Sequence, residues 1–361
     1  MESLSTDNQL FAGVMSGTSL DGLDIAFCRF NRTSSGIGFQ IDHAQTIPYD
    51  QATKAMLEQA YSSDGPTLAK LHADFGRFIG AQVVRCGESQ GLTPLFISSH
   101  GHTIFHRPDL GYTFQLGLGA AIAAASGTDT ICDFRTTDVA LGGQGAPLVP
   151  IGDRLLFSGH KFCLNLGGIA NISYEQSGEV LAFDICPVNM ALNMLSREVG
   201  FEFDDGGKLA SEGLVNESLL NALNHLSIYA STGPVSLGRE WFEREFQPLI
   251  INDEIPLCDR LRTVTEHVAA RISKVLFNSP GTTMLTTGGG AFNDFLIECI
   301  EEQVSKHGIH VVVPDQEVVS FKEALIFALL GWLRVNEEVN TFSSVTGSRN
   351  NSVGGCIYLG A

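Results

Sequence analysis

Apolar and polar residues near the start of the chain follow a pattern that predicts a β-hairpin. A first apolar run ends at Met15, and a second run alternates apolar and polar positions through Leu23, Ile25 and Phe27. The residues between the two runs, 16–22, are small and polar, which is typical of a turn that joins two strands. The hairpin is therefore the first structural feature that the sequence predicts.

The predicted turn has the residue types that a phosphate group requires. Gly17 and Gly22 permit a positive φ and let a ligand approach the backbone, and successive free N–H groups in such a turn bind anions. Hydroxyl donors and hard carboxylate oxygens, which Mg²⁺ prefers as ligands, lie in or beside the turn. They belong to Thr18, Ser19, Asp21 and Asp24. An ordinary hairpin turn is the alternative, because glycine-rich turns are common.

Beyond the hairpin, the apolar periodicity predicts an α/β chain whose second half repeats the order of the first. We expect strands at 38–47, 95–99, 113–115, 130–133, 162–166, 170–174, 180–183, 283–287, 310–313 and 356–359, and helices at 50–61, 67–90, 120–126, 189–198, 217–226, 239–246, 259–278, 294–306 and 321–335. Glycine turns follow strands at 16–22, 167–168 and 288–290. Three such turns in a duplicated chain predict a nucleotide held in a cleft between two domains.

A histidine-rich segment follows the predicted strand 95–99. His100, His102 and His106 lie there, at the kind of strand end where α/β folds place ligand groups. Metal binding by the three histidines is one interpretation, but a metal demands strict ligand geometry and no carboxylate lies nearby. Hydrogen bonding to a polar substrate and a purely structural role are the other interpretations, and both are favoured over a metal.

Asp184 follows the predicted strand 180–183 and precedes a proline and a helix. A carboxylate at the carboxyl end of a strand is well placed for chemistry. The alternative is that Asp184 caps the amino terminus of the helix, a position that Asp favours. The two interpretations have about equal weight on the residues alone.

The composition excludes several functional classes. A chain of 361 residues is long enough for two domains, and its 40 acidic residues exceed its 22 Lys and Arg residues to give a net charge of −18. That charge argues against binding nucleic acid or an anionic membrane surface. The eight cysteines are spread singly, without the paired spacing of a zinc site. The polar first residues and the lack of a membrane-spanning apolar run lead us to expect a cytoplasmic protein.

Seven motifs, in order along the chain, together resemble one family. They lie at 13–22, 99–106, 133–135, 142–150, 165–171, 184–189 and 287–293. On these motifs the chain resembles the anhydro-N-acetylmuramic acid kinases, a family of the sugar kinase/Hsp70/actin-like superfamily. The resemblance implies an α/β, two-lobed actin-like ATPase fold, which is a ribonuclease H-like duplication with a cleft between the lobes. We expect lobe I at 1–138 and 340–361, and lobe II at 139–339.

The resemblance implies an unusual reaction. The family opens the 1,6-anhydro ring of anhydro-N-acetylmuramic acid with water and phosphorylates the freed O6 from ATP, giving N-acetylmuramic acid 6-phosphate in cell-wall recycling. It implies ATP and Mg²⁺ as cofactors, a small sugar as substrate and a homodimer. Asp184 matches the catalytic acid residue of the family, and a carboxylate there can take a proton from the attacking water.

The resemblance also implies which residues bind the nucleotide. The hairpin would cradle the β- and γ-phosphates, with Mg²⁺ held by Asp21 directly or through water. The segment 165–171 would be an opposing phosphate turn, and 288–293 would face the adenosine. The residues implied are Ser16, Gly17, Thr18, Ser19, Leu20, Asp21, Gly22, Leu23, Asp24, Gly167, Gly168, Asn171, Gly288, Gly289, Gly290 and Asn293.

On the substrate side the implied contacts are His102, Arg135, Gln144, Asn189 and Glu323. Arg135 is our candidate for an anionic group, either the sugar carboxylate or a phosphate, because arginine binds both bidentately. Glu323 lies near the start of the predicted helix 321–335. It either touches the ligand or, as an acid in the first turn, interacts favourably with the helix dipole.

The chain departs from the family pattern mainly on the substrate side. Ile185, Cys186 and Val188 stand where relatives have a hydroxyl residue and two glycines. Leu118 stands where relatives commonly have an acid, and His102 where they often have Gln. The alternatives are therefore a kinase for another anhydro or amino sugar, or a catalytically silent nucleotide-binding regulator on the same fold.

Overall fold

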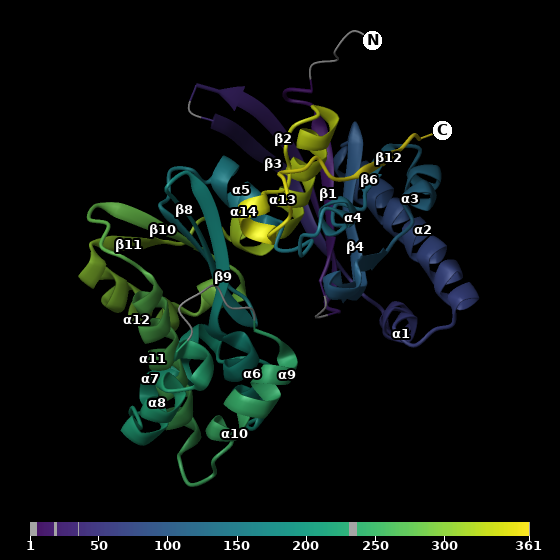
Figure 1. Cartoon of the computed structure of the whole chain (residues 1–361). Helices are drawn as coiled ribbons and strands as arrows, with labels where there is room; N and C mark the ends of the chain where they lie inside the picture. The colour runs from purple at the N-terminus through teal and green to yellow at the C-terminus, as the bar shows by residue number, and fades with distance from the viewer. Residues whose placement is uncertain (1–5, 18–19, 35, 231–236, 361) are drawn as a thin grey trace. The chain divides into compact units, whose positions relative to one another are not determined.

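The chain divides into two units, each built on its own β-sheet (Figure 1). The structure, a computed structural model, describes residues 6–17, 20–34, 36–230 and 237–360. Unit 1 comprises Met1–Leu156 and Phe321–Ala361, and unit 2 comprises Phe157–Ser320. The boundaries differ from the expected 138/139 and 339/340, because residues 139–156 and 321–339 pack with the first sheet.

Unit 1 contains a mixed seven-stranded sheet with the order β12-β6-β4-β1-β2-β3, and β5 pairs with β4. Strands β1, β2 and β3 are antiparallel neighbours, whereas β4 runs parallel to β1 and β6 runs parallel to β4. The strands are β1 (Leu10–Ser16), β2 (Gly22–Thr33), β3 (Gly36–Pro48), β4 (Phe96–Arg107), β5 (Tyr112–Leu116), β6 (Asp129–Cys132) and β12 (Cys356–Tyr358).

Unit 2 repeats this topology in a five-stranded sheet with the order β11-β10-β7-β8-β9. Strands β7, β8 and β9 are antiparallel neighbours, and β10 and β11 are parallel to β7. The strands are β7 (Phe162–Leu166), β8 (Ile169–Gln176), β9 (Glu179–Pro187), β10 (Thr282–Thr287) and β11 (Ile309–Val312). The shared strand order confirms the α/β class and the predicted internal duplication.

The helices begin at local capping signals. Asp50 and Asp64 accept hydrogen bonds from the N–H groups of Thr53 and Thr67, so they cap the first two helices. Unit 1 contains α1 (Gln51–Ala60), α2 (Gly65–Gln90), α3 (Gly119–Ser126), α4 (Thr136–Ala140), α5 (Val149–Leu156), α14 (Ser343–Thr346) and most of α13 (Gln316–Val335). Unit 2 contains α6 (Asn189–Arg197), α7 (Lys208–Glu212), α8 (Glu217–Asn224), α9 (Arg239–Trp241), α10 (Gln247–Ile250), α11 (Leu257–Val275) and α12 (Asp294–Val304).

Each sheet buries one apolar face against its own helices. In unit 1, Phe75 and Ile79 of α2 join Val14 and Ile25 of the hairpin in one buried cluster. In unit 2, a second cluster combines the buried side chains of β7 and β8 with those of α11 and α12. No helix within the described ranges is both long and apolar enough to cross a membrane.

Three elements extend beyond their predicted ends. Strand β4 continues through Arg107, so the histidine-rich segment lies within the strand, because β5 pairs with that part of it. Strand β9 continues through Pro187, because Cys186 and Pro187 still pair with β8 beyond a bulge. Helix α13 begins at Gln316, five residues before its predicted start, and Asp315 accepts a hydrogen bond from the N–H of Val318 there.

Helix α13 lies unusually close to the first sheet. A methyl group added to Gly13 of β1 would overlap the carbonyl oxygen of Ala324, in the middle of α13. The Ser98 hydroxyl of β4 donates a hydrogen bond to the carbonyl of Phe327 in the same helix. On the far side, Lys322 forms a buried ion pair with Asp153 of α5 at 2.6 Å. These contacts fix α13 relative to the strands that carry the hairpin.

Replacing Gly13 with Ala tests this close approach. The added methyl group must displace the backbone of α13, so we expect Gly13→Ala to lower the free energy of unfolding by about 3 kcal/mol. Urea denaturation measures the change. Gly65→Ala is the matched control, because nothing lies within 4 Å of the added methyl group at that position. Equal stability of the two variants would contradict the packing described here.

Candidate functional site

The predicted hairpin forms at the end of β1 and the start of β2 in unit 1. Ser16 pairs with Leu23, so the connecting turn begins at Gly17. Leu20 has a φ of 59°, and its N–H donates to the carbonyl of Gly17 at 3.4 Å. The Leu23 side chain is fully buried in the core, so this residue could reach a ligand only through its backbone.

Two carboxylates flank the second half of the turn. Asp21 is exposed, whereas Asp24 is half-buried and accepts a hydrogen bond from the Thr46 hydroxyl at 2.6 Å. Burial raises the pKa of Asp24, the Thr46 hydrogen bond lowers it, and the nearby Asp21 raises it further. Thr18 and Ser19, two of the predicted phosphate contacts, lie outside the described residues.

The Ser16 hydroxyl is held by two side chains from other elements of unit 1. The Tyr49 hydroxyl donates to Ser16 Oγ at 2.6 Å, and Ser16 Oγ lies 2.9 Å from His102 Nδ1. All three residues are at most 5% exposed. Burial lowers the pKa of His102, so the imidazole is neutral at pH 7. Its Nδ1 therefore faces the hairpin, whereas the sequence predicted a contact with the substrate.

Arg135 and His100 form a second buried polar contact. Arg135 Nε donates to His100 Nε2 at 3.0 Å, so His100 Nδ1 carries the hydrogen that it donates to the carbonyl of Gly101. Arg135 Nη1 donates to the carbonyl of Gly145 at 2.6 Å. Burial lowers the pKa of Arg135 to about 10, and Glu323 opposes this shift. No described residue bonds to Nη2, which leaves one end of the guanidinium available to an anion.

His106, the third histidine, lies apart from this contact. It is exposed, and its Nδ1 bonds to the Thr113 hydroxyl at 3.1 Å. Across the described ranges, no group of three or more His, Cys, Asp or Glu side chains is arranged to hold a metal ion. The interpretation of the three histidines as metal ligands is therefore not supported.

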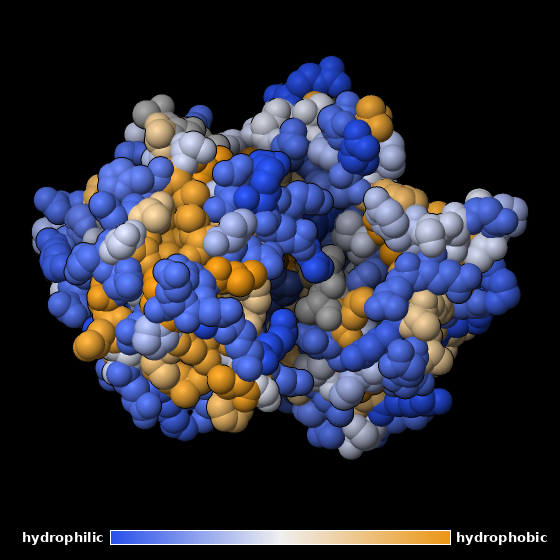
Figure 2. All heavy atoms as spheres, turned by 90° about the horizontal axis from the view of Figure 1, so that it is seen from below, coloured by the Kyte–Doolittle hydropathy of each residue, from blue (hydrophilic) through white to orange (hydrophobic). Residues whose placement is uncertain are grey.

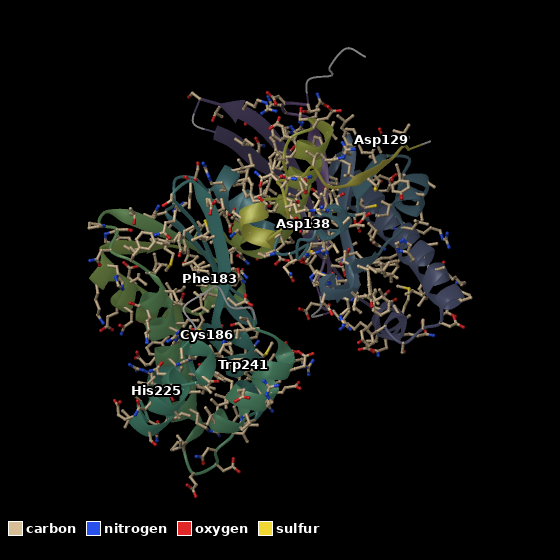
Figure 3. All side chains as sticks on the ribbon, in the orientation of Figure 1. Asp129, Asp138, Phe183, Cys186, His225 and Trp241 are labelled. Carbon is tan, nitrogen blue, oxygen red and sulfur yellow. The ribbon has the colours of Figure 1, made fainter. Side chains whose placement is uncertain are left out.

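Asp138 organises the loop that follows Arg135 (Figure 3). Its fully buried carboxylate accepts a hydrogen bond from the N–H of Gly145 at 2.7 Å and another from the Thr346 hydroxyl at 2.7 Å. The neighbouring Gln144 has an exposed side chain, and its N–H donates to the carbonyl of Thr346. Asp138 thus holds Gly145, the residue to which Arg135 donates.

Glu323 lies in the third turn of α13, because that helix begins at Gln316. The interpretation of Glu323 as a first-turn acid that interacts with the helix dipole is therefore wrong. Its side chain reaches solvent, yet surrounding protein atoms desolvate the carboxylate and raise its pKa. Asp24 raises that pKa further, whereas Arg135 lowers it. Glu323 therefore shares one electrostatic environment with the hairpin and with Arg135.

In unit 2, the two predicted glycine turns are neighbours because β7 and β10 are adjacent and parallel. Thr287 at the end of β10 pairs with Asn165 near the end of β7. Gly288 has a φ of 82°, and a methyl group there would lie 2.6 Å from Asn165 Oδ1 and 2.9 Å from the backbone of Leu166. Only glycine fits this position, so the turn after β10 lies flat against the end of β7.

Asp184 lies within β9, beside a bulge at Ile185. Its Oδ2 accepts a hydrogen bond from the N–H of Leu237 at 2.8 Å. Burial raises the pKa of Asp184, and the Leu237 hydrogen bond lowers it. The helix-cap interpretation is wrong, because Val188 occupies the N-cap position of α6 and Asp184 makes no capping bond.

Asp184 belongs to a row of polar residues that crosses the second sheet. Asn165 pairs with Asn171 on the neighbouring strand, and Asn171 pairs with Asp184 on the next. Directly opposite residues of antiparallel strands point to the same face. The three side chains therefore share the face opposite to Leu164 and Ile172, which belong to the core.

The other two predicted residues of unit 2 serve its turns. Asn189 Nδ2 donates to the carbonyl of Leu166 at 3.0 Å, beside both glycine turns. This location is nearer the predicted nucleotide side than the predicted substrate side. Asn293 Oδ1 accepts a hydrogen bond from the N–H of Leu296 and caps α12. The side-chain oxygen of Asn293 is thus committed to the helix.

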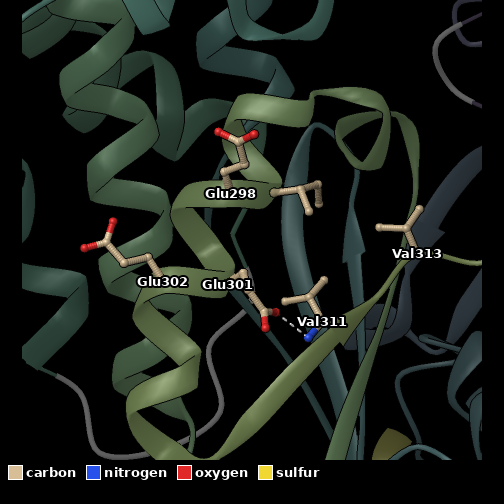
Figure 4. Close-up of a pocket in the computed structure, with 6 residues that line it drawn as sticks. Glu298, Glu301, Glu302, Val311 and Val313 are labelled. Carbon is tan, nitrogen blue, oxygen red and sulfur yellow. Dashed lines mark hydrogen bonds between the residues drawn. The ribbon is translucent and has the colours of Figure 1, made fainter.

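A pocket of about 490 Å³ lies on unit 2, away from these residues (Figure 4). Its lining residues are Ile297, Glu298, Glu301, Glu302, Val311 and Val313. Glu301 accepts a hydrogen bond from the N–H of Val311 at 2.6 Å, which pairs α12 with the edge strand β11. None of the predicted site residues lines this pocket.

Tyr49 and His100 are site residues whose roles the sequence did not predict. Tyr49 lies one residue beyond β3, and no local pattern links it to Ser16. His100 was seen only as a metal candidate. A signal for Asp138 was present, because an acid within five residues of Arg135 and before a Gly-rich loop commonly accepts loop N–H groups.

The chain is similar to one family over nearly its whole length. The model of the family "Anhydro-N-acetylmuramic acid kinase" matches residues 9–360. A protein of that name from Caldanaerobacter subterraneus subsp. tengcongensis is 32% identical, over 98% of this chain and 98% of its own length. The one from Gloeobacter violaceus is 34% identical, over 95% of this chain and 96% of its own length.

Among solved structures, the chain is similar to an activator of 2-hydroxyisocaproyl-CoA dehydratase from Clostridium difficile, with a TM-score of 0.44 and 13% identity. That likeness covers 91% of this chain and 96% of the activator.

Replacing Asp138 with Asn tests the loop anchor. Asparagine keeps one acceptor but directs an NH₂ group at a neighbouring donor, so we expect Asp138→Asn to lower the free energy of unfolding by about 3 kcal/mol. Chemical denaturation measures the loss. Asp109→Asn is the control, because Asp109 is exposed and its change should be within about 0.5 kcal/mol. Equal stability of the two variants would show that Asp138 does not hold the loop.

Proposed function

Because the chain belongs to the anhydro-N-acetylmuramic acid kinase family, we propose that Asp184 activates the attacking water in the family's reaction. The protein is a phosphotransferase of an ATP-using family, and its substrate is the anhydro sugar from which that family takes its name. What remains to be assigned is the role of each residue.

The environment of Asp184 supports its role as the base. One carboxylate oxygen accepts the N–H of Leu237, and no described residue donates to the other. The raised pKa that burial produces makes the carboxylate a better proton acceptor than an exposed aspartate. Asn171 and Asn165 lie beside it on the same face and offer amide groups to a polar ligand.

The chemistry proposed for Asp184 balances without a further reactant. Water attacks C1 of the anhydro sugar, and its proton passes to Asp184 as the new C1–O bond forms. The C1–O6 bond breaks, and O6 keeps the electron pair. O6 then attacks the γ-phosphorus of ATP, and ADP leaves with the electrons of the broken P–O bond. The residues around the phosphates contribute positioning rather than covalent chemistry.

For the phosphates we propose the hairpin in unit 1 and the two glycine turns in unit 2. The hairpin offers main-chain N–H groups between Ser16 and Gly22, and the flat backbone at Gly288 lets a planar group approach. The exposed carboxylate of Asp21 fits Mg²⁺, which commonly takes one protein carboxylate together with phosphates and water. Mg²⁺ bound there would neutralise charge on the phosphates.

For the sugar we propose contacts with Arg135 and Glu323 in unit 1. The free Nη2 of Arg135 suits the carboxylate of the substrate, because guanidinium groups bind carboxylates in a defined geometry. The carboxylate of Glu323 can accept a hydrogen bond from a sugar hydroxyl. Gln144, whose side chain is exposed at the loop held by Asp138, is a further donor.

We further propose a cytoplasmic homodimer. The singly spread cysteines support a reducing compartment. Val199, Phe201 and Phe203 of unit 2 are each more than half exposed within five residues of chain, and such clusters commonly lie in interfaces. Figure 2 shows one face of the molecule on which hydrophobic residues gather in a patch bordered by hydrophilic ones. Light scattering of the purified protein gives its mass in solution.

The role of Asp184 is tested with the variant Asp184→Asn. It removes the proton acceptor but keeps the size of the side chain, so we expect kcat to fall about 1,000-fold while ATP still binds. The measurements are sugar-dependent ADP release and calorimetric binding of ATP. Glu179→Gln, at the exposed start of the same strand, is the matched control and should have normal activity.

The pH profile of the unmodified protein gives a second measure of the same role. Only the ionised carboxylate accepts a proton, so activity should fall as the pH decreases through the pKa of Asp184. Because burial raises that pKa, we expect the acidic limb above the ordinary aspartate value of 3.8. Normal turnover of Asp184→Asn would show that another residue is the base.

A further inference from the structure

Tyr49 contacts both ends of the hairpin turn. Its hydroxyl donates to Ser16 Oγ at 2.6 Å, just before the turn, and its backbone N–H donates to the carbonyl of Asp21 at 3.3 Å, just after it. Tyr49 can reach both because it follows β3, whose last residue, Pro48, pairs with Gly22. A single residue therefore sets the separation between the two ends of the turn.

His102 completes this arrangement from β4. Because the Tyr49 hydroxyl donates to Ser16 Oγ, the Ser16 hydrogen remains available for His102 Nδ1 at 2.9 Å. The neutral imidazole then carries its own hydrogen on Nε2. The Ser16 hydroxyl is committed in both directions, so it has no hydrogen left to donate to a phosphate.

One aromatic ring of α2 supports both hydrogen-bonding partners. Phe75 is fully buried, and its ring centroid lies 6.3 Å from that of Tyr49 and 6.4 Å from that of His102. Phe78 also contacts the Tyr49 ring, at 6.1 Å. The packing of α2 thus fixes Tyr49 and His102, and through Ser16 it fixes the start of the turn.

We propose that Tyr49 and His102 are positioning residues that hold the hairpin in its phosphate-binding conformation, with Ser16 as their point of attachment. This inference rests on the proposed function, in which the hairpin binds the phosphates of ATP. An ordered turn has already lost its conformational entropy before the ligand arrives, so its N–H groups bind more tightly. Ser16 then acts through the backbone of the turn and does not contact the phosphate itself.

The test compares ATP binding by Tyr49→Phe and by the unmodified protein. Tyr49→Phe keeps the ring and the backbone bond to Asp21 and deletes only the hydroxyl. We expect the Kd for ATP, measured by calorimetry without sugar, to rise about tenfold, and KM for the sugar to stay unchanged. Tyr112→Phe, an exposed tyrosine of the same unit, should bind ATP normally. A purely structural role would lower the melting temperature without changing the Kd below it.

His102 provides an independent series. Asparagine can present a side-chain oxygen to Ser16 as an acceptor, whereas leucine cannot. We therefore expect His102→Asn to bind ATP more tightly than His102→Leu, and this order is predicted even if Tyr49→Phe does not fold. Equal Kd values for the two histidine variants, or an unchanged Kd in a folded Tyr49→Phe, would overturn the inference.

One further variant separates this inference from the function on which it rests. Gly17→Pro removes a main-chain donor of the turn without touching Tyr49, Ser16 or His102. If Gly17→Pro binds ATP normally, the hairpin is not the phosphate site and the proposed function of the hairpin fails. If Gly17→Pro loses ATP binding and the Tyr49 and His102 variants do not, only the positioning role fails.

A different observation, independent of the function, concerns Cys132 and Cys356. They are direct partners in the antiparallel pair formed by β6 and β12. Opposite residues of such a pair have Cα atoms about 4.5–5.5 Å apart, which is within the range that a disulfide spans. Cys356 is exposed to solvent and Cys132 is buried beneath it. The two thiols therefore face one another, with one of them accessible to a reagent.

We infer that Cys132 and Cys356 form a disulfide when the protein meets a low-molecular-weight disulfide. The Cys356 thiolate attacks one sulfur of the reagent, forming a mixed disulfide and releasing one thiol. Cys132 loses its proton and attacks Cys356 Sγ, which releases the second thiol. The protein loses two hydrogen atoms, the reagent is reduced to two thiols, and the last strand of the chain becomes covalently attached to β6.

Incubation of the full chain with oxidised glutathione tests this inference. We expect the intact mass to fall by two hydrogen atoms and a peptide map to link Cys132 with Cys356. Cys132→Ser should retain glutathione on Cys356, whereas Cys258→Ser, a half-exposed cysteine of unit 2, should still form the disulfide. Stable glutathione on Cys356 of the unmodified protein, or no reaction there, would refute the pairing.

Discussion

The close contact between α13 and the first sheet is the constraint on which the candidate site in unit 1 depends. Gly13 leaves no space between β1 and the backbone of Ala324, and the buried pair of Lys322 with Asp153 holds the helix from its other side. Glu323 lies between Lys322 and Ala324 in the sequence, so these contacts determine where its carboxylate sits. The helix therefore brings an acid from late in the chain to the hairpin near its start.

The two units use the same topology but stabilise their first turns differently. In unit 1 the turn is attached through side chains, because Ser16 is held by Tyr49 and His102. In unit 2 the shorter turn is attached through its backbone, since the carbonyl of Gly168 accepts the N–H of Val188. A short turn needs no external support, whereas a longer turn has more conformational freedom to lose. Duplication thus supplied two phosphate-type turns of unequal rigidity.

The sequence predicted what depends on neighbouring residues and missed what depends on distant ones. The hairpin and the turn at Gly288 follow from local patterns of apolar residues and glycine. Strand β9 extends past Asp184 only because β8 continues to pair with it, and that partner is invisible in a local window. The early start of α13 could have been predicted, because Asp315 has the residue type and position of an N-cap.

The charge of the protein makes the geometry of the hairpin decisive. A chain with a net charge of −18 repels a polyanion such as ATP, so binding must come from local donors. The cations of unit 1 near the hairpin are already engaged, Arg135 with Gly145 and Lys322 with Asp153. Main-chain N–H groups therefore provide most of the attraction, and unlike a mobile cation they bind only when they converge on one point. The energetic importance of Tyr49 follows from this, because it fixes both ends of the turn that carries those groups.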